Sequence, residues 1–224
     1  MTIQAAFLFT QEDTNPTANA YYTFQNDGTV KMDGSDSAGI SIAIVNATTN
    51  NTYWDISAYN NGNIILNGNS NYGIMTSEKT RLSLNSIVNN AGKIEINGEE
   101  SVGIAVLGNS KAKFENTGEI EIINTKKSSG FYGNFVDGNV LNSNIINIVN
   151  SETSSGIRSE AGIILNDGIG VITISGGEKN IGMLGIGNNA NIKNSGNITV
   201  NGGEKNLGLY LENNAVGSND GIIA

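Results

Sequence analysis

The sequence contains no cysteine and no histidine, and it has a single proline, Pro16, among its 224 residues. Without cysteine there is no disulfide framework, and without both residue types there is no Ser-His-Asp triad, Cys-His dyad or ordinary structural zinc site. Basic residues number 12 against 21 acidic ones, which gives a formal net charge of −9. This charge argues against a nucleic-acid partner, because phosphate binding requires a basic surface.

The sequence also lacks a membrane-spanning segment, a signal peptide and a C-terminal cap. No apolar run approaches the ~20 residues that a membrane-spanning helix needs. Residues Met1–Thr10 lack the basic segment of a signal peptide, so we expect the sequence to begin inside a longer protein. At the other end, Asn219-Asp220-Gly221 opens a unit that breaks off at Ala224, without the polar cap that a solenoid needs. We therefore expect the natural protein to continue.

Glycine and asparagine are the residues that the chain has in abundance, with 29 and 37 copies. Both are poor helix formers, which argues against a helical protein. Both also tolerate left-handed backbone conformations, which suits a fold with many corners.

The sequence repeats with a period of 26 residues, most regularly from about Asn90 to Leu209. An I-x-I segment recurs at this spacing, and its first residues are Ile94, Ile120, Ile146, Ile172 and Ile198. An N-x-G turn precedes the segment in most units, and a glycine-hydrophobic pair such as Gly156-Ile157 follows it. Each unit is therefore a short series of apolar segments separated by turns.

The alternation of apolar and polar residues in these short segments predicts strands rather than helices. A unit of short strands and corners cannot bury its own apolar face, whereas stacked units bury a continuous core. The sequence therefore predicts an all-β protein, a right-handed parallel β-helix (single-stranded solenoid) with about 26 residues per coil and roughly 7–8 coils. Stacked turns are expected to form an asparagine ladder through Asn90, Asn116, Asn142 and Asn194.

Two parts of the chain are distinguished by their regularity. Residues 1–24 are expected to be irregular or to start the solenoid, and residues 25–224 to form β-helix repeats, strict from about residue 90. Towards the N-terminus the same unit is longer, and the extra residues are assigned to inserted loops at Val45–Ser57 and Thr76–Ser86. Because functional residues concentrate on loops, these two loops are the predicted contact regions.

Candidate catalytic residues do not form a pattern in the repeat. No two aspartates lie one 26-residue step apart among Asp33, Asp36, Asp55, Asp137 and Asp167. Glu95 and Glu121 do stack, but they alternate with core isoleucines and are interpreted as solvated strand positions. The two arginines, Arg81 and Arg158, occupy different points of the repeat. The sequence thus assigns no catalytic residue, no metal ligand and no cofactor, and it leaves the binding residues open.

Two further features have a functional and a structural interpretation. The turn Gly176-Gly177-Glu178-Lys179-Asn180 recurs at 202–206 and is either a charged ligand-binding ridge or, as we favour, a solvated turn. Aromatic residues gather near the N-terminus, at Tyr21, Tyr22, Phe24, Tyr53, Trp54 and Tyr59. They are either a platform for sugars or a protein partner, or residues that pack over a loop or an end coil, which we favour.

The repeats resemble the passenger repeats of autotransporter adhesins, in particular large outer-membrane adhesins of fusobacterial type. The resemblance is carried by Asn89–Val106 and Asn194–Tyr210, in the order N-x-G, I-x-I, G-x-x-S-x-G-I, and extends from about Gln25 to the end. It implies a right-handed coil and a surface-exposed passenger secreted through its own C-terminal β-barrel, which this sequence does not include. Absence of cysteine fits passengers that cross the outer membrane unfolded. No binding residue of the family maps onto a motif here.

The resemblance leads to a functional hypothesis and two alternatives. We expect a non-enzymatic stalk of a bacterial surface adhesin, at the outer membrane or secreted and monomeric as a fragment, with roles in cell adhesion and virulence. Its expected partner is a host or bacterial surface protein or glycan. The first alternative is a carbohydrate-active β-helix enzyme, similar to a polysaccharide lyase or hydrolase, which three or more carboxylates converging in a groove would favour. The second is a spacer without a ligand.

Overall fold

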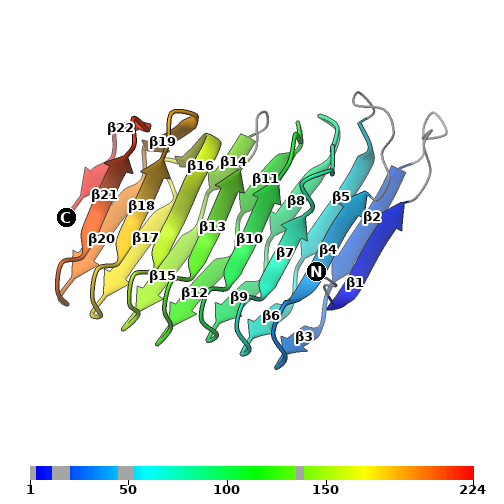
Figure 1. Ribbon diagram of the computed structural model, residues 1–224, viewed down its shortest axis with the longest axis horizontal. Helices are drawn as coiled ribbons and strands as arrows, with labels where there is room; N and C mark the ends of the chain where they lie inside the picture. The colour runs from blue at the N-terminus through cyan, green and yellow to red at the C-terminus, as the bar shows by residue number, and fades with distance from the viewer. Residues whose placement is uncertain (1–3, 12–20, 45–52, 135–138) are drawn as a thin grey trace.

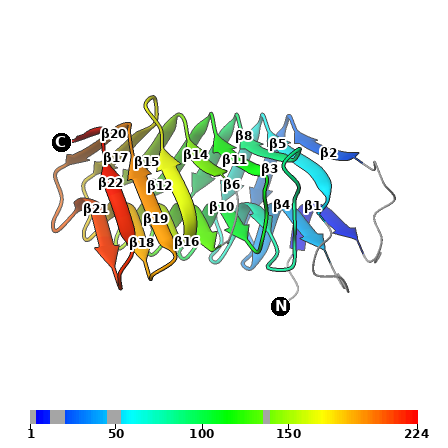
Figure 2. The same cartoon turned by 90° about the horizontal axis from the view of Figure 1, so that it is seen from above.

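The computed structural model describes residues 4–11, 21–44, 53–134 and 139–224, and every regular element in these ranges is a β-strand. The strands stack in parallel along one axis, from β1 (Gln4–Gln11) to β23 (Ile222–Ile223), as Figure 1 shows. Seen at right angles, the chain winds around this axis coil by coil (Figure 2). The fold is the parallel β-helix that the sequence predicts, and successive coils in its regular part are 26 residues apart.

Each coil contributes a strand to each of three sheets, called A, B and C in the order in which the chain reaches them. Sheet A comprises β1, β4 (Ser37–Ile44), β7 (Tyr72–Thr76), β10 (Val102–Leu107), β13 (Ser129–Asn134), the first part of β16 (Ser155–Asn166), β18 (Ile181–Ile186) and β21 (Leu207–Glu212). Sheet B comprises β2 (Tyr21–Asn26), β5 (Asp55–Asn60), β8 (Ile87–Asn90), β11 (Lys113–Asn116), β14 (Asn139–Asn142), the second part of β16, β19 (Ala190–Asn194) and β22 (Val216–Asn219). Sheet C comprises β3 (Thr29–Met32), β6 (Asn63–Leu66), β9 (Lys93–Ile96), β12 (Glu119–Ile123), β15 (Ile145–Val149), β17 (Val171–Ser175), β20 (Asn197–Asn201) and β23.

The core runs along the axis, between the three sheets. Ile94, Ile120 and Ile146 are direct partners in adjacent strands of sheet C, and all three are fully buried. The predicted stacking of the repeated isoleucines is therefore confirmed. Burial of each such side chain contributes about 1.5–3 kcal/mol, so this column stabilises the stack of coils.

An asparagine ladder occupies the corner between sheets B and C. The Nδ2 atom of each asparagine donates to Oδ1 of the asparagine one coil further on, at 2.7 to 2.9 Å, through Asn26, Asn60, Asn90, Asn116, Asn142, Asn166, Asn194 and Asn219. The predicted ladder is confirmed and extends further in both directions. Asn166 was not among the predicted members, because its turn is longer and its spacings to the neighbouring asparagines are 24 and 28 residues.

The N-terminal segment begins the solenoid. β1 pairs with β4 and β2 pairs with β5, so residues before 25 already belong to sheets A and B. Of the predicted loop Val45–Ser57, residues 45–52 lie outside the described residues. The rest is not a loop, since Ser57 lies within β5 and Trp54 is 4% exposed and forms a β-bridge with Leu82. The loop interpretation is wrong there, because the Trp54 side chain is part of the main core.

The second predicted loop lies at the corner between sheets A and B. Thr76 ends β7, and residues 77–86 connect that strand to β8. Leu82 of this segment is fully buried, whereas Leu84 is 77% exposed. The segment therefore buries Leu82 in the core and presents Leu84 to solvent.

Candidate functional site

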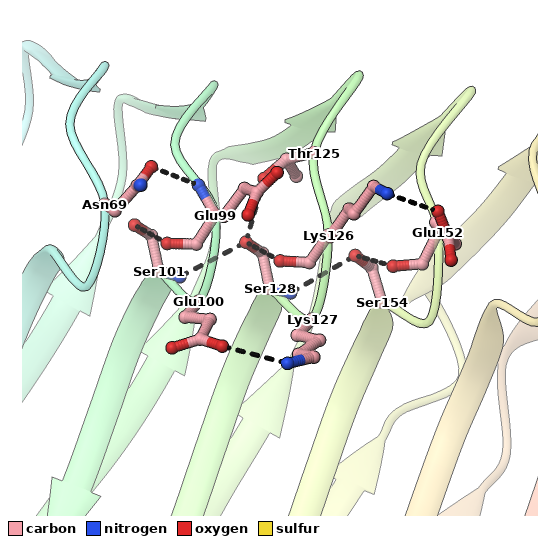
Figure 3. Close-up of polar contacts among 10 residues, drawn as sticks. All are labelled: Asn69, Glu99, Glu100, Ser101, Thr125, Lys126, Lys127, Ser128, Glu152 and Ser154. Carbon is pink, nitrogen blue, oxygen red and sulfur yellow. Dashed lines mark hydrogen bonds and ion pairs between the residues drawn. The ribbon is translucent and has the colours of Figure 1, made fainter.

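The corner between sheets C and A holds a second column of buried polar side chains. At each step a backbone N–H donates to the side-chain oxygen one coil further on, as from Ser101 to Ser128 and from Ser128 to Ser154, both at 3.2 Å (Figure 3). The column comprises Ser37, Asn71, Ser101, Ser128, Ser154, Asn180 and Asn206, of which all but the half-buried Asn206 are buried. It satisfies backbone donors that a turn would otherwise leave unpaired in the interior.

The residue before each member of this column has a left-handed backbone. Its φ lies between 51° and 56° at Asp36, Ser70, Glu100, Lys127, Thr153, Lys179 and Lys205. This conformation disfavours residues with a Cβ by roughly 1–2 kcal/mol. The turn thereby projects side chains outward, where Glu100 pairs with Lys127 at 3.1 Å (Figure 3).

Thr153 is the least suited of these residues, because a β-branched side chain is a true outlier in the left-handed region. We expect Thr153→Asn to raise the free energy of unfolding by about 1 kcal/mol, since asparagine tolerates this backbone. Urea denaturation measures the difference. The matched control is Asn150→Thr, which places threonine at another exposed left-handed position, with φ 48°, and should lose a similar amount. Equal stability of both variants with the unaltered protein would contradict this account.

A cleft lies on the outer face of sheet A and spans the coils of β7, β10, β13 and β16. It has a volume of about 380 Å³ and is lined by Tyr72, Glu100, Val102, Lys127, Ser129, Tyr132, Arg158 and Glu160. Four coils separated by ~4.8 Å give it a length of about 14 Å. We call it the tyrosine cleft. It is large enough for a small ligand.

Tyr132 is held in place by contacts with the next coil. Its hydroxyl donates to Glu160 Oε2 at 2.8 Å, and the other oxygen of Glu160 accepts from an Arg158 Nη at 2.5 Å. The Arg158 guanidinium also lies 5.7 Å from the centroid of the Tyr132 ring, within cation–π range. Burial, followed by the hydrogen bond to Glu160, raises the pKa of Tyr132 to about 12. The ring is thus fixed, and its hydroxyl keeps its proton to a higher pH than that of an unperturbed tyrosine.

The other end of the cleft is apolar. Tyr72 and Val102 pack against a small cluster formed by Ala38, Met75 and Ala105, which is separate from the main core. Burial, and then the charge of Asp36, raises the pKa of Tyr72. The cleft therefore joins a tyrosine with an apolar surrounding to a tyrosine in a charged network.

Titration of the tyrosines tests the Tyr132 network. We expect Tyr132→Phe to remove a component that ionises near pH 12 from the tyrosinate absorbance curve. The folded state holds this proton more tightly than the unfolded chain, whose tyrosine pKa is about 10, so the unaltered protein should also lose stability between about pH 10 and 12. Tyr210→Phe, at the equivalent point of the outermost described coil, should retain the component. If Tyr210→Phe removed the component near pH 12 and Tyr132→Phe retained it, the assignment of this component to Tyr132 would be wrong.

The aspartates singled out from the sequence are not brought together in the described residues, whereas Glu95 and Glu121 are direct partners in adjacent strands of sheet C, as predicted. Asp33 accepts from Asn67 and pairs with Lys31, whereas Asp167 accepts from Ser143. Asp36 is one of the left-handed turn residues, Asp55 bonds to Ser83, and Asp137 lies outside the described residues. Glu121 pairs with Lys93 at 2.5 Å, and Glu95 accepts from Asn97. Within the described part of the chain, no three acidic residues form a group that could hold a metal ion.

The repeated Gly-Gly-Glu-Lys-Asn turns carry exposed charges, and among the aromatic residues Trp54 is buried in the core whereas Tyr21 is 54% exposed. Glu178 pairs with Lys179 at 2.7 Å, with both side chains at least 40% exposed, and Asn180 and Asn206 belong to the buried column. Tyr22 and Phe24 pack against the core, and Lys111 Nζ lies 4.4 Å from the Tyr53 ring. Tyr21 donates to Ser57, and Tyr59 lies in β5.

Sequence reasoning missed the tyrosine cleft. Tyr132 and Arg158 are direct partners in adjacent strands, so their spacing of 26 residues was a usable signal. Glu160 follows two residues later, on the same face. These residues do not form a motif that points to a known chemistry. Their association becomes visible only from their contacts in the structure.

Comparison with known proteins does not add a family. No family model matches the chain, and neither the curated proteins nor the solved structures include a significant match. In the described residues there is no helix with the length and apolar character needed to span a membrane.

Proposed function

We propose that this chain is a non-enzymatic β-helical segment of a bacterial surface adhesin of the autotransporter type. In this role it is a stalk that presents its surface and its corner loops to a host or bacterial cell. The proposal places the chain at the cell surface or in secreted form, and its partner is a surface protein or a glycan. Support comes from the resemblance of the repeats and from the shape of the molecule.

The observation that carries the proposal is the continuity of the two polar columns. The asparagine ladder links every coil from Asn26 to Asn219, and the column at the corner between sheets C and A links every coil from Ser37 to Asn206. Each hydrogen bond contributes about 0.5–1.5 kcal/mol, and an orphaned partner would cost more. Bending one coil away from the next would break bonds at two corners at once. This makes the solenoid a stiff rod, as a stalk requires.

Surface labelling of the source bacterium tests this proposal. Antibodies raised against the purified chain should label intact cells, and external protease should remove the label. A cytoplasmic enzyme of the same cells serves as the control for membrane integrity. Labelling that requires permeabilised cells would contradict a surface location and therefore the adhesin function.

A carbohydrate-active enzyme is the second candidate, and the tyrosine cleft is where its chemistry would lie, although the cleft is lined by two carboxylates rather than the three or more that such an enzyme was expected to show. Glu100 and Glu160 both line the cleft, although each is paired with a neighbouring cation, Lys127 or Arg158. The test is release of reducing ends from uronate polymers by the purified chain. Activity that Glu160→Gln abolishes would support this function in place of the stalk.

A further inference from the structure

The charges that line the tyrosine cleft are balanced. Glu100 pairs with Lys127 at 3.1 Å on one side, and Glu160 pairs with Arg158 at 2.5 Å on the other. The lining thus provides two carboxylates and two cations, within a chain whose formal net charge is −9. Such a cleft does not select for a charged ligand, because any ionic group would meet both signs at short range. It fits a neutral ligand that can both donate and accept hydrogen bonds.

The cleft also offers aromatic surface that is already ordered. The hydroxyl of Tyr132 is fixed by Glu160 and its ring by the Arg158 guanidinium, so little side-chain entropy remains to be lost on binding. Tyr72 and Val102 add an apolar end. Aromatic residues with a polar tip suit ligands that have apolar faces and hydroxyl edges.

Hydrogen-bonding capacity remains on the opposite side. Lys127 and Glu100 project from left-handed turns, and their side chains are 67% and 56% exposed. In the part of the chain that the structure describes, the Lys127 ammonium bonds only to Glu100, through one of its two carboxylate oxygens. The ammonium can donate further bonds and the carboxylate can accept them. A pair of neighbouring hydroxyl groups matches this combination.

We propose that the tyrosine cleft binds a short neutral oligosaccharide. A pyranose ring presents apolar C–H faces to Tyr132 and hydroxyl groups to Glu100 and Lys127. The volume of about 380 Å³ and the length of about 14 Å accommodate a short oligosaccharide rather than a single small group. The inference rests on the adhesin proposal for its biological role, and it names the class of ligand. The binding itself is a property of the cleft.

Saturation-transfer NMR on the purified chain tests this binding. The probes are the neutral disaccharides lactose, cellobiose and chitobiose, with digalacturonate as the acidic probe. At least one neutral probe should receive saturation, and Tyr132→Ala should weaken its binding roughly tenfold by removing the aromatic contact. Lys127→Ala, a change at an exposed side chain, should also weaken it.

Tyr210→Ala is the matched control, because Tyr210 occupies the same outward column three strands away and does not line the cleft. It should bind the neutral probe as the unaltered chain does, and circular dichroism melting checks that each variant is folded. Saturation of none of the neutral probes, or of digalacturonate alone, would overturn the proposal. So would equal losses in Tyr132→Ala and Tyr210→Ala. Failure here leaves surface labelling unaffected, so the two proposals fail separately.

Discussion

Asn116→Ala should lower the free energy of unfolding by about 3 kcal/mol. Asn116 is fully buried and accepts from Asn90 at 2.8 Å, while it donates to Asn142 Oδ1 at 2.9 Å and to the Ile145 carbonyl at 3.2 Å. Alanine removes all three bonds and leaves the oxygen of Asn142 in the interior without its donor. An orphaned buried polar group costs roughly 1–3 kcal/mol, and here the loss affects the coils on both sides.

Urea denaturation followed by circular dichroism measures this loss. Asn219→Ala is the matched control, since Asn219 is exposed and has a ladder partner on one side, where it accepts from Asn194, and otherwise donates to the Gly221 carbonyl at 3.2 Å. The control should lose at most about 1 kcal/mol. Similar losses in both variants would show that a buried asparagine of the ladder contributes little beyond what an exposed asparagine contributes.

Gly156→Ala is expected to destabilise the protein by about 3 kcal/mol, by overpacking. A Cβ at this position would lie 2.7 Å from the Gly182 carbonyl oxygen and 2.8 Å from Cγ2 of the buried Ile172. The first of these atoms belongs to the backbone of the next coil, so it moves only if the strand moves. The same close approach to the next coil's backbone recurs at Gly39, Gly73, Gly103, Gly130 and Gly182, which explains why the repeat retains glycine there.

The control for this prediction is Gly168→Ala. Gly168 has open space around an added Cβ and no positive φ, so alanine fits. The control should leave the free energy of unfolding unchanged or raise it by up to about 1 kcal/mol, because alanine lowers the conformational entropy of the unfolded chain. The melting temperatures of both variants provide the comparison. Comparable melting of Gly156→Ala and the unaltered chain would show that the coils can separate enough to admit a methyl group.

The sequence was sufficient to predict the fold because the physical requirements repeat with the coils. Ile94 and Ile120 lie at the same point of adjacent coils, so the period of the sequence is the period of the core. Asn90 and Asn116 show the same 26-residue period at the corner between sheets B and C, where they are hydrogen-bonded to each other. Trp54 could not be placed in this way, because its coil has a different length and its contact with Leu82 occurs once.

The cleft was less accessible to sequence reasoning. Tyr132, Arg158 and Glu160 differ from one another, so the repeat contains no column of identical residues to draw attention to them. Their association depends on the outward direction of alternate strand residues and on the exact pairing of β13 with β16. The left-handed turn residues were equally hidden, since Glu100, Lys127 and Thr153 share a backbone conformation and no chemistry.

The unequal spacings of the asparagine ladder have a consequence for how this chain can change. Neighbouring asparagines are separated by 34, 30, 26, 24, 28 or 25 residues, yet each reaches the next at 2.9 Å or less. Each asparagine therefore returns to the same corner whatever the length of the coil before it, and a difference in coil length does not shift the coils that follow. Insertions and deletions at a corner are local events. New surface loops can be acquired one at a time, while the rest of the solenoid keeps its sequence and its register.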